Sequence, residues 1–145
     1  MIQNELLRDT VALLRQHLDS ASEMDLKLED ELMRDIGDLL HTYNLTHSRK
    51  MTILACYTLI YKAIHKHQEL FLQDDAALGR GILDGDYLFG LYHRLAAGRQ
   101  EWKLLIHLSL FNKRMQLALL KGQSAPALLV DLKKEIRSYL DRNCA

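Results

Sequence analysis

Proline, cysteine and net charge are all scarce in this sequence. Its 145 residues include one Pro, two Cys and seven Gly, and 19 Lys and Arg balance 19 Asp and Glu. So little Pro and Gly excludes collagen-like and low-complexity chains. Two Cys in unlike settings exclude a disulfide scaffold and favour a reducing compartment. The zero formal net charge gives no long-range field that would draw the chain to nucleic acid or anionic lipid, so neither is an expected partner.

Long apolar runs are lacking as well. No stretch reaches the roughly 18 uninterrupted apolar residues of a membrane-spanning helix, and the first residues lack the basic-then-apolar order of a signal peptide. We therefore expect no transmembrane segment and a cytoplasmic location. The sequence is nevertheless 48% hydrophobic, and a chain of about 150 residues buries about 68–70% of its unfolded surface. One domain covering residues 1–145 is expected.

Apolar residues recur at helical spacing through most of the chain. This periodicity predicts six helices, over about residues 3–19, 22–43, 51–67, 83–97, 102–121 and 124–140. Gly79 and Gly81 are expected in a loop before the fourth helix, and Ser124 should cap the sixth, with Pro126 in its first turn. The third helix is apolar on more than one side, which predicts a central position. No convincing strand occurs, so the expected fold is all-α, a single compact bundle.

Histidine and carboxylate side chains cluster at the end of the third predicted helix, as His65, His67 and Glu69. Such groups are typical metal ligands. On a helix, however, His67 points roughly 160° away from the other two, so we interpret all three as solvated residues. The other His residues occur singly, which favours structural roles. Cys56 lies in an apolar run with no nearby group to activate it and is interpreted as a buried, inert thiol.

Two further pairs of carboxylates have competing interpretations. Asp74-Asp75 resembles the start of a magnesium motif, but a third carboxylate one helical turn later is missing, so an exposed loop pair is favoured. Asp84 and Asp86 precede an aromatic-rich helix. There, carboxylates commonly satisfy free N–H groups and face the positive end of the helix dipole. We interpret this second pair as the cap of the fourth helix.

The same segment has a more specific resemblance. Residues 82–96 read Ile-Leu-Asp-Gly-Asp-Tyr-Leu-Phe-Gly-Leu-Tyr-His-Arg-Leu-Ala and resemble the Gly-Asp-aromatic-Leu helix of all-trans polyprenyl diphosphate synthases. The motif residues are Gly85, Asp86, Tyr87 and Leu88. The resemblance covers about residues 50–121 and is closest to the small component of the two-component hexaprenyl and heptaprenyl enzymes. The short chain is most similar to the hexaprenyl small subunit, which implies a truncated isoprenoid-synthase fold.

The metal-binding motif of that family is altered in this chain. The helix before the Gly-Asp helix ends there in His-Asp-Asp-x-x-Asp, whereas this sequence reads His-Gln-Glu-Leu-Phe-Leu from His67 to Leu72. Gln68, Glu69 and Leu72 replace the three aspartates, and Gln and Leu offer no anionic oxygen to Mg²⁺. No counterpart of the second aspartate motif is found. The resemblance therefore implies no catalytic residue, no metal site and no cofactor in this chain, with Mg²⁺ held by a separate large subunit.

The function implied by the resemblance is that of a regulatory and structural small subunit. It would form a heterodimer with the catalytic large subunit of a hexaprenyl or heptaprenyl diphosphate synthase, and would be needed for activity and for setting prenyl chain length in menaquinone side-chain synthesis. The chain would be part of an enzyme only in that pair, and would meet prenyl diphosphate and the membrane only indirectly, through its product. The alternative is a free-standing helical adaptor that binds a partner helix.

Two sets of residues are expected to carry the function of such a subunit: a partner interface and a wall of the product tunnel. The resemblance predicts the partner contact on the fourth and fifth helices, and the fourth helix has more apolar surface than one core-facing stripe requires. The expected interface residues are Leu88, Leu91, Tyr92 and Leu95. In the resembled family the growing product descends between helices that correspond to the third, fourth and fifth. The expected wall of this product tunnel consists of Leu88, Tyr92, Leu108 and Phe111.

Overall fold

The chain folds into helices throughout the part that the structure describes. The computed structural model describes residues 2–18, 30–68 and 75–144, and within these ranges it contains six helices and no strand. The helices are α1 (Ile2–His17), α2 (Asp30–His41), α3 (His47–Gln68), α4 (Asp75–Gly98), α5 (Trp102–Leu120) and α6 (Ala125–Asn143). The prediction of an all-α bundle is confirmed.

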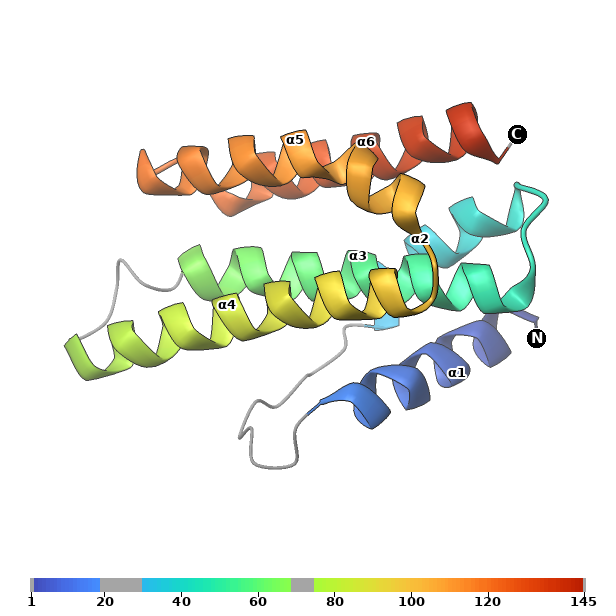
Figure 1. The fold of residues 1–145 in the computed structure, drawn as a ribbon, viewed down its shortest axis with the longest axis horizontal. Coiled ribbons are helices and arrows are strands. Elements are labelled where there is room, and N and C mark those ends of the chain that lie inside the picture. The colour runs from blue at the N-terminus through green and yellow to red at the C-terminus, as the bar shows by residue number, and fades with distance from the viewer. Residues whose placement is uncertain (1, 19–29, 69–74, 145) are drawn as a thin grey trace.

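The centre of the bundle is α3. It contacts α1, α2, α4 and α6, and it runs side by side with α4 (Figure 1). Every residue from Thr52 to Tyr61 is buried, so α3 is covered on all sides over nearly three turns. This burial explains why its apolar residues do not form a single stripe. The expected central position of the third helix is thus confirmed.

The last two helices form a layer of their own. Figure 1 shows α5 and α6 above α3 and α4, with α1 on the opposite side. Helix α5 packs against α6 and, more sparsely, against α4. Between α4 and α5 the chain turns at Gln100, whose φ of 64° is in the left-handed region, and Glu101 N–H donates to the carbonyl of Ala96 at 2.8 Å. This tight turn sets the direction in which α5 leaves α4.

The start of α4 differs from the prediction. The helix begins at Asp75 and includes Gly79 and Gly81, which were expected in a loop. Asp84 and Asp86 therefore lie inside the helix, and their interpretation as N-terminal caps is wrong. Each Gly costs a helix about 1 kcal/mol relative to Ala, but packing along α3 can outweigh this local penalty. Helix propensity alone therefore predicts a start of α4 that is several residues too late in the sequence.

The other boundaries follow the predictions more closely. Ser124 occupies the N-cap position of α6 and Pro126 its first turn, although the Ser124 side chain makes no capping hydrogen bond. Helix α4 ends at Gly98, as expected. The part of the second predicted helix before residue 30, and Asp74 of the predicted carboxylate pair, lie outside the described residues.

Candidate functional site

The Gly-Asp-aromatic-Leu motif lies on α4. Gly85 and Leu88 are buried, Tyr87 is half-buried and Asp86 is exposed. On the neighbouring helix, Gln68 is the last residue of α3. The other two positions of the altered metal motif, Glu69 and Leu72, lie outside the described residues, as does the side chain of His67.

The predicted interface residues of α4 are core residues. Leu88, Leu91, Tyr92 and Leu95 are each 2% exposed or less. They pack inside the chain's own core and offer no surface to a second chain, so the expectation that they form the partner interface requires correction. The apolar excess of α4 that led to this expectation is absorbed by packing against α3. A charged substitution at these positions would disrupt the fold before it disrupted any assembly.

The predicted tunnel residues come together in the same core. Leu88 and Tyr92 on α4 and Leu108 and Phe111 on α5 are all buried. They belong to one continuous apolar cluster that extends through the bundle. All four residues thus belong to the apolar core, and Phe111 also lines the pocket between α5 and α6.

An apolar stripe lies on the outer face of α5. Its exposed side chains are Trp102 (56% exposed), Ile106 (73%), Leu110 (62%), Leu117 (48%) and Leu120 (81%). At about 100° per residue these five positions fall within an arc of about 80°, and at 1.5 Å per residue they extend over about 27 Å. We call these five residues the α5 stripe. The opposite face of α5 is buried in the core, so the helix is apolar on two sides.

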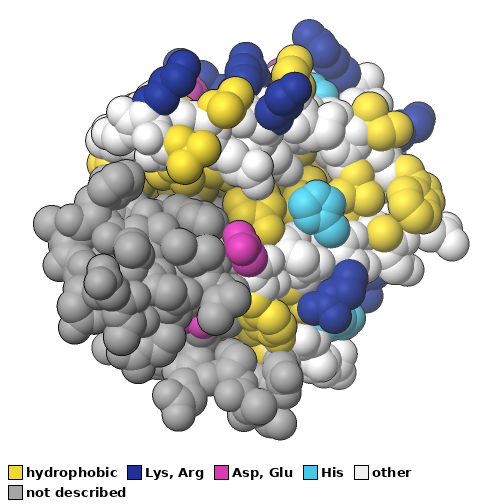
Figure 2. Space-filling model, turned by 60° about the vertical axis from the view of Figure 1, so that its left-hand side comes forward, with side chains coloured by type: hydrophobic (Ala, Val, Ile, Leu, Met, Phe, Trp, Pro, Cys, Tyr) yellow, Lys and Arg dark blue, Asp and Glu magenta, His cyan; other side chains and the backbone are white. Residues whose placement is uncertain are grey.

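The charged residues of α5 itself are of one sign. Helix α5 contains no Asp or Glu, and its charged residues are Lys103, Lys113 and Arg114, followed by Lys121 at the C-cap. Lys113 lies within the stripe, between Leu110 and Leu117 on the same face. In Figure 2, Lys and Arg side chains are interspersed with hydrophobic ones along the upper edge, over the layer of α5 and α6. The exposed face of α5 therefore combines apolar surface with positive charge.

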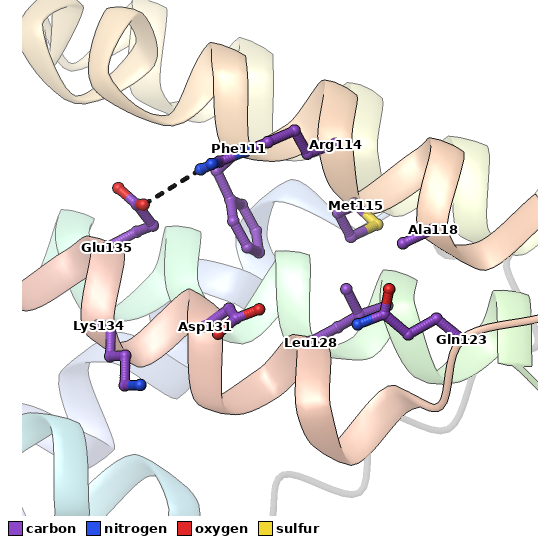
Figure 3. A pocket seen from close by; sticks show the side chains of 9 residues that line it. All are labelled: Phe111, Arg114, Met115, Ala118, Gln123, Leu128, Asp131, Lys134 and Glu135. Carbon is purple, nitrogen blue, oxygen red and sulfur yellow. Dashed lines mark hydrogen bonds and ion pairs between the residues drawn. The ribbon is translucent and has the colours of Figure 1, made fainter. Parts of the chain in front are cut away.

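A small pocket lies between α5 and α6. It has a volume of about 280 Å³, and Phe111, Met115 and Leu128 supply apolar walls (Figure 3). Arg114 on α5 donates to Glu135 on α6 at 3.3 Å, and His107 Nε2 lies 3.1 Å from the same carboxylate. These contacts hold the two helices together and fix which face of α5 points outward.

A polar network fixes the beginning of α5. Glu101, just before the helix, is 5% exposed and accepts hydrogen bonds from Arg49 at the start of α3 and from Tyr139 near the end of α6. The hydrogen bonds to Glu101 raise the pKa of Arg49, and burial raises the pKa of Tyr139. Cys144 Sγ lies 3.9 Å from Arg49. No sequence pattern predicts this network, because its members are far apart in the chain and show no local spacing.

The remaining candidate side chains, Cys56 and His65, pack against neighbouring residues of the chain. Cys56 is fully buried, and this burial raises the pKa of its thiol, as expected of an inert cysteine. His65 packs against the ring of Tyr61, with 4.7 Å between the ring centroids. Among the residues that the structure describes, no three His, Cys, Asp or Glu side chains gather in a way that could hold a metal ion.

Comparison with known proteins adds no assignment to this geometry. Within the described ranges, no helix is both long enough and apolar enough to cross a membrane. No protein-family model, no curated protein and no solved structure matches the chain.

Proposed function

We propose that this chain is a non-catalytic subunit that pairs with a separate catalytic subunit of a polyprenyl diphosphate synthase. The observation that supports a subunit most directly is the α5 stripe. Soluble monomers rarely expose a contiguous apolar patch of more than a few hundred Å², and here five large side chains share one face of one helix. Such a face is expected where a helix meets a partner.

The location of the stripe agrees with this proposal. Helix α5 follows α4 through the tight turn at Gln100, and α4 contains the motif that resembles the prenyltransferase family. A partner on α5 would therefore lie one helix away from Leu88 and Tyr92, the proposed tunnel residues. We expect an interface of about 2,000 Å² or more in total, as in obligate complexes, with the stripe as its central part.

The chemistry of the reaction belongs to the partner in this proposal. Gln68 and Leu72 supply no anionic oxygen where the resembled family has aspartates. The catalytic subunit would hold Mg²⁺ and the diphosphates, and this chain would provide buried apolar side chains that influence product length. We place the pair in the cytoplasm, in the synthesis of the menaquinone side chain, with the hexaprenyl enzyme as the most similar system.

A helical adaptor is the second candidate, because the same α5 stripe would serve to bind a partner helix. The two functions differ in what happens after binding. A synthase subunit changes prenyl transfer by its partner, whereas an adaptor only brings proteins together. The deciding measurement is therefore enzymatic activity of the purified pair.

The test is co-expression with a polyprenyl diphosphate synthase chain from the same genome that has both aspartate motifs intact. We expect the two chains to co-purify and to make long prenyl diphosphates only together. Ile106→Glu and Leu110→Glu should abolish co-purification, because each buries an unpaired charge in the contact. The matched control is Val130→Glu, since Val130 is 55% exposed but lies on α6 outside the stripe. Co-purification without any effect on prenyl transfer would favour the adaptor.

A further inference from the structure

The position of Lys113 restricts what can cover the α5 stripe. Its side chain is exposed on the same face as Leu110 and Leu117, and it forms no ion pair with any described residue. A partner that covers the stripe must therefore cover this ammonium group or lie directly beside it. A cation placed in an apolar contact is costly unless a carboxylate faces it.

A second copy of this chain would not supply that carboxylate. If two copies of α5 paired antiparallel about the middle of the stripe, their Lys113 residues would be offset by about 6 Å along the helix axis. In the same arrangement Lys103 of one copy would lie beside Lys121 of the other. A parallel pair would place the two Lys113 side chains opposite each other. Each arrangement brings like charges together, and α5, which has no Asp or Glu, supplies no carboxylate to compensate them.

A membrane surface fits the stripe less well than a protein does. Amphipathic helices that bind lipid carry their Lys and Arg residues on the polar face, away from the acyl chains. Lys113 instead lies inside the apolar face, where a lipid-embedded stripe would bury it. An ordered carboxylate on a protein partner can meet the charge at this fixed position, whereas acyl chains cannot.

We propose that the α5 stripe binds an apolar helical surface of another protein that presents a carboxylate opposite Lys113, and that Lys113 prevents two copies of this chain from pairing through the same face. This inference rests on the proposed function, since it specifies the chemistry of the partner subunit. The inference and the proposed function can be tested separately, because the preference of the α5 stripe for a carboxylate can be measured without the partner enzyme.

The experiment uses Trp102 as the reporter. It is the only Trp in the chain and a member of the stripe, so its emission should shift to shorter wavelength when the stripe is covered. The probes are three Trp-free amphipathic peptides of about 20 residues, the length of α5, that share one Leu stripe. They differ only in the central residue of that stripe, which is Glu, Gln or Lys.

We expect the full chain to bind the Glu peptide about tenfold more tightly than the Gln peptide and to bind the Lys peptide weakest, because the charge pair lies at the desolvated centre of the contact. Lys113→Glu should reverse this order, and Lys113→Met should bring the three affinities close together. Arg142→Glu, on the exposed end of α6, is the matched charge-reversal control and should preserve the original order.

Four results would overturn the inference, and the first three concern the peptides and self-association. These three are equal affinity for all three peptides, an order of affinities that is unchanged in Lys113→Glu, and a concentration-dependent Trp102 shift with dimer formation by the unmodified chain alone. A Trp102 shift with phosphatidylglycerol vesicles and none with any peptide would also overturn it, in favour of a lipid surface. If the peptides rank as expected but no synthase subunit pairs with the chain, the proposed function fails while the surface assignment holds.

Discussion

Arg49 and Glu101, which are 52 residues apart in the sequence, form a bidentate ion pair. Arg49 Nε donates to Glu101 Oε1 at 2.8 Å, and Arg49 Nη2 donates to Glu101 Oε2 at 3.1 Å. Arg49 lies at the start of α3, and Glu101 lies in the turn from α4 to α5. The pair joins the central helix to the outer layer. It therefore controls how α5, with its exposed stripe, is held on the rest of the bundle.

Removing the negative charge of Glu101 should destabilise the fold. Glu101→Gln leaves the Arg49 guanidinium without its counter-ion in a half-buried site, and we expect the free energy of unfolding to fall by about 2 kcal/mol. Urea unfolding followed by circular dichroism measures this change. The control is Asp35→Asn, which breaks the exposed pair of Asp35 with Lys133 and should cost less than about 1 kcal/mol. Equal effects of the two variants would contradict the importance of the buried pair.

Two buried tyrosines should respond oppositely to loss of the hydroxyl. The Tyr92 hydroxyl faces Asn112 but has no hydrogen-bond partner of normal geometry among the described residues. Tyr92→Phe should therefore leave the free energy of unfolding unchanged or raise it by up to about 1 kcal/mol. The Tyr139 hydroxyl donates to Glu101 at 3.2 Å and accepts from Arg49 at 3.3 Å. Tyr139→Phe should therefore lower the free energy of unfolding by about 1 kcal/mol. Parallel denaturation curves would show the difference, and a loss of stability in Tyr92→Phe would contradict the account of this hydroxyl.

Stability should decrease in acid partly because of His41. Burial, and then the positive charge of Lys50, lower the pKa of His41 below its ordinary value of 6.5, with a smaller opposing effect of Asp38. The unfolded chain therefore takes up this proton at a higher pH than the folded chain does. The stabilising contribution is fully present above about pH 6.5 and declines as the pH falls toward the lower pKa of the folded state.

Comparison with a variant isolates this contribution from the other histidines. We expect the melting temperature of the unmodified chain to fall more steeply than that of His41→Gln between about pH 6.5 and pH 5. Lys50→Met removes the neighbouring charge, whose ammonium lies 3.0 Å from His41 Nδ1, and should raise the pKa of His41 in an NMR titration. Identical pH profiles for the unmodified chain and His41→Gln would count against this assignment.

Product length should depend on the buried residues between α4 and α5, if the proposed function holds. We expect Leu108→Ala or Phe111→Ala, assayed in the assembled pair, to lengthen the products where it removes a stopper. One isoprene unit adds five carbons, and each buried CH₂ contributes about 0.8 kcal/mol, so one more unit of tunnel favours the longer product by about 4 kcal/mol. Chromatography of the prenyl products measures the distribution.

The control for product length is an alanine substitution elsewhere in the core. Leu132→Ala on α6 removes a fully buried side chain outside the proposed tunnel and should lower yield at constant product length. Leu88→Ala and Tyr92→Ala complete the set of proposed wall residues. If all four wall variants behave like Leu132→Ala, these residues have a structural role only.

The sequence predicted the helices better than it predicted the helix faces. Periodicity located α5 because apolar residues recur along it, but Leu108 belongs to the buried face and Ile106 to the exposed one. A helix that is apolar on two sides has no single stripe, so spacing cannot tell the core face from the partner face. The same ambiguity made Leu91 and Tyr92 candidates for an interface that their burial excludes.

Long-range contacts explain the other differences. The start of α4 was misplaced because Gly79 and Gly81 have low helix propensity, whereas α4 continues through both positions and packs, as a whole, mainly against α3. The hydrogen bond between Tyr139 and Glu101 joins residues that are 38 positions apart, and no local sequence motif predicts it. Short-range patterns therefore defined the elements, and contacts between distant residues determined which surfaces remained free.

The burial of α3 on all sides also determines the order in which the molecule can lose structure. Amide hydrogens between Thr52 and Tyr61 can exchange with solvent only when neighbouring helices separate, so they should exchange by the rare global opening of the bundle. Helix α5 has one face in water and belongs to an outer layer, so its amides can exchange through smaller, more frequent openings. A partner bound to α5 would slow exchange in that layer most, and this slowing would map the bound surface residue by residue.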